Sequence, residues 1–171
     1  MDQSIRNKLR SVVTQCRKLL EEAVRQVLQG QFGIYETGKK DEIHVEDEDR
    51  MKNLSGEDKG YRRDIQAHLG HIGALGYKAK DALAQLVREI AFTHLNRLCA
   101  YKMMEARAVW IGGKPFREAV SRGMKSQGFQ FYLADDNHQE DKQLFDTGHQ
   151  DVAYRHFLSW LGATLSEEIG V

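Results

Sequence analysis

The stretch Ala91–Arg107, AFTHLNRLCAYKMMEAR, has the apolar spacing of an amphipathic helix yet carries several polar and charged side chains. We placed a helix over residues 80–107 at roughly 100° per residue. The predicted core face comprises Leu83, Val87, Ile90, Ala91 and Leu98, with Leu86 and Leu95 at its borders. His94 falls in the middle of this face, and Tyr101 and Glu105 continue it toward the C-terminus. The first half of the face is therefore apolar and the second half is polar.

The polar half of this helix needs partners or water, because an unpaired buried charge is strongly destabilising. Arg97 and Tyr101 are four residues apart, and Lys102 and Glu105 are three apart. Both spacings bring side chains together on a helix surface. We predict a structural polar cluster of His94, Arg97, Tyr101, Lys102 and Glu105. The alternative is that Arg97 and Lys102 meet a phosphate or a partner domain.

Helical patterns continue on both sides of this stretch. From Ser4 to about Gln31, apolar residues recur at helical spacing. They are Ile5, Leu9, Val12 or Val13, Cys16, Leu19 or Leu20, Ala23 and Val27. Ser55 and Asp58 have the spacing of a capping box at the start of another helix. A last helix is predicted over 151–169.

The remaining segments predict shorter elements. The residues around TGKKD predict a small β-hairpin near 34–45, with Ile34–Tyr35 and Ile43–Val45 as its strands. Pro115 suits a first helical position, so we expect a short helix from there to about Ser126. We expect an extended segment at 128–134 and a polar loop at 135–148. The fold class is thus mainly α, a bundle-like single domain of about five helices over residues 1–171, with the hairpin added.

The charge of the chain sums to zero but is unevenly distributed. Residues 1–33 carry a net charge of +3, residues 34–60 of −4, residues 61–134 of +7 and residues 135–171 of −6. The basic segment can meet a polyanion or pair with its acidic flanks. No apolar run reaches the roughly 18 residues of a membrane span. The two cysteines form no metal spacing, so we expect reduced thiols and a cytoplasmic protein.

Sequence motifs of a catalytic centre are missing. The chain has no P-loop, no G-x-S-x-G and no G-x-G-x-x-G. His68 and His71 lie one helical turn apart, but no HExxH motif or cysteine pair supplies further zinc ligands. The acidic residues of 135–141 crowd one polar segment, which we interpret as solvated. We therefore predict no catalytic residue, no metal site and no cofactor site in this segment.

The stretch Phe92–Arg107 resembles the N-terminal helical region of large adenine-specific DNA methyltransferases of BREX-type phage-defence systems and related single-chain restriction–modification enzymes. The shared family phrase is aromatic-x-x-x-N-R-hydrophobic-x-A-x-[RK]-x-M-E. Its positions here are Phe92, Asn96, Arg97, Leu98, Ala100, Lys102, Met104 and Glu105. REAVSRGMKSQGFQFYLAD and DVAYRHFLSWLGATLSEEIGV are also similar to that family, so the resemblance covers most of the chain. The segment Trp110–Phe116 departs from the family pattern.

This resemblance implies that the parent protein is an S-adenosylmethionine-dependent adenine-N6 DNA methyltransferase. Such an enzyme holds the flipped-out adenine with an Asn/Asp-Pro-Pro-Tyr/Phe loop. The single proline here lies in KPF. We therefore expect a domain truncated before the methyltransferase domain, with no cofactor in this segment and S-adenosylmethionine bound by the parent protein. The alternative is a stand-alone relative of that domain.

The resemblance leaves two roles open. One is contact with the backbone of double-stranded DNA, combined with docking on the missing methyltransferase domain or on other defence-system subunits. The candidate phosphate contacts come from the basic segment and lie near helix ends or turns. They are Lys78, Lys80, Arg117, Arg122 and Lys125. The alternative is a protein-interaction module of a defence complex without direct DNA contact, and a free-standing enzyme has little support.

Overall fold

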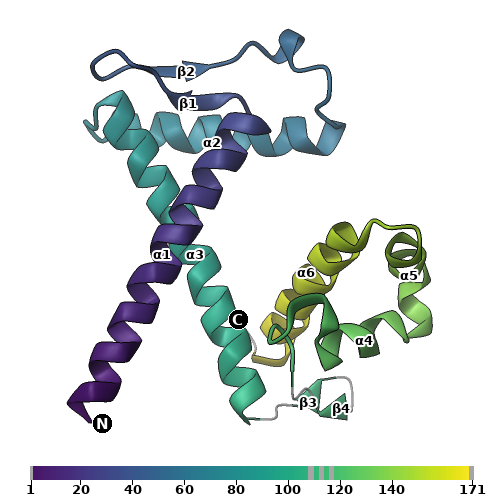
Figure 1. The fold of residues 1–171 in the computed structure, drawn as a ribbon. Helices are drawn as coiled ribbons and strands as arrows, with labels where there is room; N and C mark the ends of the chain where they lie inside the picture. Colours follow the sequence, from purple (N-terminus) through teal and green to yellow (C-terminus); the bar gives the residue numbers. More distant parts are fainter. Residues whose placement is uncertain (1, 108–109, 112–113, 116–117, 170–171) are drawn as a thin grey trace. The chain divides into compact units, whose positions relative to one another are not determined.

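The computed structural model describes residues 2–107, 110–111, 114–115 and 118–169. Their contacts divide the chain into two compact units, Met1–Leu95 and Asn96–Val171. The described part contains six α-helices and two small antiparallel sheets (Figure 1). The predicted fold class, mainly α with a small hairpin, is confirmed. That residues 1–171 form one domain cut before a methyltransferase domain stays a prediction.

The first unit is built on two long helices, a third helix and a hairpin. Its elements are α1 (Gln3–Gly30), β1 (Ile34–Glu36), β2 (Ile43–Val45), the 3₁₀ turn η1 (Glu48–Arg50), α2 (Gly56–Ala74) and the N-terminal part of α3 (Ala79–Arg107). Strands β1 and β2 pair antiparallel with Tyr35 opposite His44, so the hairpin prediction is confirmed. The long helices predicted for residues 4–31 and 80–107 are present almost to the residue.

The core of the first unit lies where the C-terminal end of α1, β1, α2 and the start of α3 meet. Its buried residues are Leu28, Phe32, Ile34, Leu69, Ile72, Ala82, Leu83, Leu86 and Val87. The buried Arg62 on α2 donates Nε–H to the carbonyl of Phe32 at 3.0 Å and a second N–H to the carbonyl of Glu46. Both carbonyls belong to residues that flank the paired strands, so the Arg62 side chain provides them with hydrogen-bond donors. Arg62 therefore joins α2 to both flanks of the hairpin.

Local sequence signals set the ends of two elements in this unit. The Ser55 hydroxyl accepts the Asp58 amide at 3.0 Å, and the Asp58 carboxylate accepts the Ser55 amide at 3.3 Å. This reciprocal pair confirms the predicted capping box at the start of α2. Gly33 has a φ of 64°, and a Cβ there would lie 2.7 Å from Cβ of Glu46. The turn between α1 and β1 therefore requires glycine.

The second unit packs short helices around α6. Its elements are the C-terminal part of α3, β3 (Trp110–Ile111), β4 (Lys114–Pro115), η2 (Gly123–Lys125), α4 (Gln127–Leu133), η3 (Asp136–His138), α5 (Gln139–Asp146) and α6 (Gln150–Ile169). Its buried core is Tyr101, Met104, Ala119, Phe129, Tyr132, Leu133, Ala153, Phe157 and Leu161. The rings of Phe129 and Phe157 are fully buried, with centroids 5.4 Å apart. The predicted last helix is confirmed as α6.

The helix predicted from Pro115 to Ser126 is wrong. Pro115 lies in β4, residues 118–122 form no helix, and a 3₁₀ turn follows at η2. Arg122 and Gly123 have φ values of 70° and 56°, which end any right-handed helix at this point. The backbone amides of residues 119–121 also donate to a glutamate side chain instead of to helical carbonyls.

Two further predictions in the second unit are wrong. Residues 128–134 are not extended, because they lie mostly in α4. The Ser126 hydroxyl caps this helix by accepting the Phe129 amide at 3.4 Å. Residues 135–148 are not a polar loop, since they form η3 and α5. Both helices are short, so each contains too few apolar residues for a helical period to be recognised in the sequence.

The predicted core face of α3 is correct only for its first part. Val87 and Ala91 are fully buried, whereas His94 is exposed and Leu98 is 37% exposed. Burial resumes at Tyr101, which belongs to the core of the second unit. Helix α3 contributes one end to each core, so the residues between belong to neither. Over the described residues, no helix is both long enough and apolar enough to cross a membrane.

Candidate functional site

The family phrase ends at Glu105, whose carboxylate accepts five hydrogen bonds. Its Oε1 atom accepts the backbone amides of Ala119, Val120 and Ser121 at 2.7, 2.6 and 2.7 Å. Its Oε2 atom accepts the Ser121 hydroxyl at 2.6 Å and the Lys102 ammonium at 2.5 Å. The Glu105 side chain is only 6% exposed. This arrangement fixes the backbone of 119–121 against the end of α3.

The electrostatics of Glu105 favour the ionised form. Burial alone raises the pKa of this carboxyl, but the hydrogen bonds from Lys102, from the Ser121 hydroxyl and from the amides outweigh it and lower the pKa to about 2. A carboxylate with five donors and this pKa is an acceptor at every physiological pH.

The other members of the predicted polar cluster differ in burial. His94 and Arg97 are exposed, whereas Tyr101 is buried and donates its hydroxyl to the carbonyl of Leu158 at 2.9 Å. Burial raises the pKa of Tyr101, and the charge of Arg97 opposes that rise. The structure thus joins Lys102 to Glu105 directly and leaves Arg97 near Tyr101 only through its electrostatic field.

The basic candidates in the first unit already have partners. Lys78 pairs with Asp41 at 3.4 Å, and both side chains are largely exposed. Lys80 donates to the carbonyl of Thr37 at 2.9 Å in a partly buried contact. Both lysines therefore tie the start of α3 to the hairpin loop. An incoming phosphate would compete with these contacts.

The remaining basic candidates belong to the second unit. Arg122 lies 3.9 Å from Glu118, and its side chain is 67% exposed. Glu118, Arg122, Lys125 and Gln127 line a shallow hollow of about 350 Å³. Arg117 lies outside the described residues. Arg122 and Lys125 are thus the two candidates that the structure places around one surface feature.

A second buried polar group in this unit is Asp141, so the interpretation of the acids of 135–141 as solvated is wrong at this position. The Tyr132 hydroxyl donates to its Oδ2, and Nδ1 of His156 lies 2.6 Å from its Oδ1. The ring of His138 stacks on Tyr132 with centroids 3.8 Å apart. Asp141 therefore ties α4, α5 and α6 together. No local pattern predicts this contact, because its members come from three elements.

The pKa values of Asp141 and Tyr132 are shifted in opposite directions. Burial raises the pKa of Asp141, but hydrogen bonds from Tyr132 and His156 outweigh it and bring the pKa below its ordinary value. Burial, reinforced by the Asp141 carboxylate, raises the pKa of the Tyr132 hydroxyl. The pair is therefore a neutral phenol bonded to an ionised carboxylate, which is a stable structural contact.

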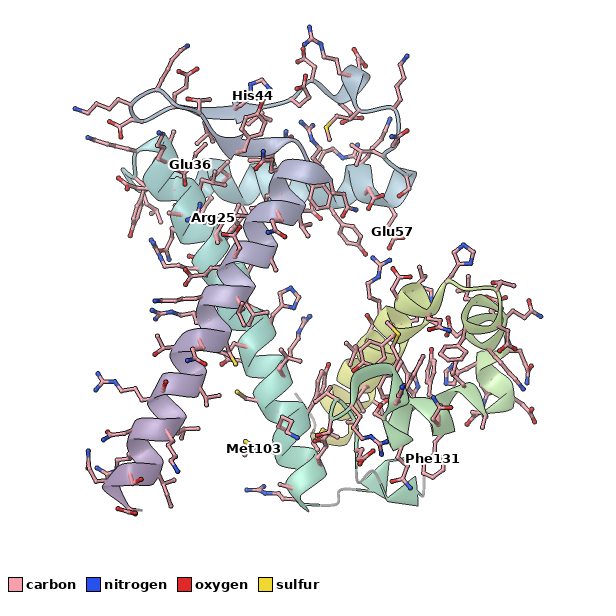
Figure 2. All side chains as sticks on the ribbon, viewed as in Figure 1. Arg25, Glu36, His44, Glu57, Met103 and Phe131 are labelled. Carbon is pink, nitrogen blue, oxygen red and sulfur yellow. The ribbon has the colours of Figure 1, made fainter. Side chains whose placement is uncertain are left out.

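The first unit has a cleft of about 470 Å³ between α1, β1 and α3. Leu28, Ile34, Leu83 and Val87 line it with aliphatic carbon, and Arg25 pairs with Glu36 at 2.8 Å on its edge (Figure 2). Gln29 and Tyr35 complete its lining, so the cleft is partly polar. Among the described residues, no three His, Cys, Asp or Glu side chains are placed to hold a metal ion.

Comparisons with models of protein families, with curated proteins and with solved structures found no match to this chain. The family resemblance therefore depends on the quoted residues alone.

Proposed function

We propose that this chain is the N-terminal helical domain of a cytoplasmic, S-adenosylmethionine-dependent adenine-N6 DNA methyltransferase of phage defence or restriction–modification. In this proposal the domain docks on its catalytic domain or on other defence subunits and contributes contacts to the DNA backbone. The segment itself is not the enzyme, and S-adenosylmethionine binds elsewhere in the parent protein.

The observation that supports this proposal is the role of the family phrase. Lys102 and Glu105 stand at its end and organise the backbone of residues 119–121. Those residues lie within REAVSRGMKSQG, a second stretch that is similar to the same family. Two separate parts of the resemblance therefore meet in one set of hydrogen bonds, as expected for a fold that both parts specify.

Among the described candidates for DNA contact, Arg122 and Lys125 are better supported than Lys78 and Lys80. They line one hollow with Gln127, whereas Lys78 and Lys80 are engaged with the hairpin loop. The Glu118 carboxylate nearby weakens the attraction of this surface for a phosphate. We therefore expect a weak contact that adds to docking and does not replace it.

The test is binding of a short duplex DNA at low and at physiological salt. The double substitution Arg122→Glu and Lys125→Glu should weaken binding and lower the dependence on salt by about one counterion for each lost phosphate contact. The matched control is Lys142→Glu with Arg155→Glu, because Arg155 is likewise an exposed arginine paired four residues away with an acid. Equal effects of the two doubles, or no binding at low salt, would reject the DNA contact.

The second candidate function is a protein-interaction module without DNA contact. Exposed apolar side chains on α3 favour it, since Phe92 is 58% exposed and Met103 is 55% exposed. The length of the source reading frame bears on both candidates, because a downstream Asn-Pro-Pro-Tyr motif would establish the parent activity. Detection of S-adenosylmethionine binding to this segment by calorimetry would contradict both.

A further inference from the structure

Helix α1 carries an apolar stripe that the first unit does not bury. Ile5, Leu9, Val12 and Leu19 are 54%, 54%, 54% and 71% exposed. The N-terminal half of α1 extends away from β1, β2 and α2 (Figure 1). Only the C-terminal end of the helix enters the core, through Leu28. An exposed apolar stripe of this length on a regular helix marks an interaction surface.

The stripe has the spacing of a coiled coil. Its members alternate in steps of four and three residues, as the a and d positions of heptads do. They are Ile5, Leu9, Val12, Cys16, Leu19 and Ala23. At roughly 100° per residue the stripe lies well away from Val24 and Leu28, the residues that pack into the unit. Helix α1 therefore has two apolar faces, and the second has the pattern that a partner helix matches.

We propose that this stripe pairs antiparallel with the stripe of a second copy of the chain, about a two-fold axis near residue 14. In that register Ile5 faces Ala23, Leu9 faces Leu19 and Val12 faces Cys16. Every layer thus places an a position against a d position, as an antiparallel pair of helices requires. The interface is isologous, so one pattern supplies both surfaces.

Charge selects this register. Lys8 and Glu22 occupy equivalent flanking positions at opposite ends of the stripe. In the antiparallel pair, Lys8 of one copy and Glu22 of the other lie within about 3 Å of each other along the helix axis, since the rise is about 1.5 Å per residue. The pair occurs twice by symmetry. Gln15 meets Gln15 of the second copy beside the axis, and two amides can bond to each other.

In a parallel pair of α1 helices, Lys8 and Glu22 would not face each other. There Lys8 would face Val13 of the second copy and Glu22 would face Val27. In the antiparallel pair, by contrast, Val13 meets its own symmetry mate on the apolar flank. The seam has about three heptads, and the test is designed for a weak association with a dissociation constant on the order of ten micromolar. This inference depends on α1 alone and not on the proposed function.

The test is sedimentation equilibrium of the full chain from about 5 to about 200 micromolar, a range chosen around that constant. The chain should be in reversible monomer–dimer exchange, and Leu9→Asp should abolish the dimer. Each of Lys8→Glu and Glu22→Lys should weaken it about tenfold, since two attractive pairs become repulsive. The double variant should restore the affinity because the pairs are re-formed with reversed signs.

Lys18→Glu is the matched control, because Lys18 is exposed on α1 outside the stripe. It should leave the dissociation constant unchanged, and circular dichroism should confirm that every variant keeps its helix content. A chain that stays monomeric throughout the range would overturn the proposal and leave the stripe to a partner of another sequence. Association that resists Leu9→Asp, or that the double charge exchange fails to restore, would overturn it as well.

Discussion

Replacing Glu105 with glutamine should destabilise the second unit more than any other single change of charge on α3. The carboxylate accepts three amides, one hydroxyl and one ammonium, all at 2.5–2.7 Å. Glutamine has the same size and keeps one acceptor oxygen for the backbone amides. It places an NH₂ group where Oε2 accepts from Ser121 and Lys102. The Lys102 ammonium and the Ser121 hydroxyl then lose the carboxylate oxygen, and the ammonium keeps only the Ser121 hydroxyl as an acceptor among these groups. We expect a loss of about 2–3 kcal/mol in the free energy of unfolding.

The lowered pKa of Glu105 arises from the same hydrogen bonds and agrees with that magnitude. Its folded value of about 2 lies below the ordinary value of 4.5, a difference of about 2.5 units. At about 1.4 kcal/mol per unit this corresponds to about 3 kcal/mol. Because the folded pKa is the lower one, this stabilisation is fully present above pH 4.5 and is lost as the pH falls toward 2. The gap between wild type and glutamine variant should close over that interval.

The assay is urea unfolding followed by tryptophan fluorescence, because both tryptophans of the chain, Trp110 and Trp160, belong to the second unit. Glu118→Gln is the matched control, since Glu118 pairs with Arg122 at 3.9 Å on the surface. Its cost should stay below about 0.5 kcal/mol. The reasoning fails if Glu105→Gln costs no more than the control, or if its cost does not change between pH 5 and pH 2.

Two further substitutions test contacts elsewhere in the chain. Asp141→Asn should cost about 1–3 kcal/mol in the same urea assay, because the Tyr132 hydroxyl and the His156 imidazole lose a charged acceptor; unchanged stability would show that this contact adds little. Ser55→Ala should cost about 1 kcal/mol and speed amide exchange at Asp58, the residue that the hydroxyl caps. Ser55→Asp keeps an acceptor at the same position, so faster exchange there too would contradict the capping role.

Long-range periodicity explains why the helices of the first unit could be predicted. Over residues 3–30 and 79–107 the apolar pattern repeats for many turns, and the Ser55 capping box gives a start signal that needs only local residues. The hairpin was predictable for the same reason, because its strands flank a turn-rich segment. Each of these signals lies within the element that it predicts.

The second unit was predicted poorly because its elements depend on contacts between distant residues. The turn at 118–122 follows Glu105, which lies more than ten residues earlier, so propensity for helix after Pro115 was misleading. Helix α5 begins in a run of acids and amides, a composition typical of a solvated segment. Its burial depends on the contacts of Asp141 with Tyr132 and His156, which the local sequence does not show. The helical wheel likewise predicted which side of α3 is buried in the first unit. It could not predict where along α3 the core of the first unit ends.

The family phrase now divides into two sets of residues. Met104 and Glu105 are buried or nearly so, and their packing and hydrogen bonds explain their identity without any partner. Asn96 and Arg97 are exposed in the same helix, where packing gives no reason to prefer them. If the phrase carries information about function beyond the fold, we expect Asn96 and Arg97 to carry it, because a partner can reach them and the core does not need them. A search for the docking surface should therefore begin at the middle of α3 and not at its well-ordered polar end.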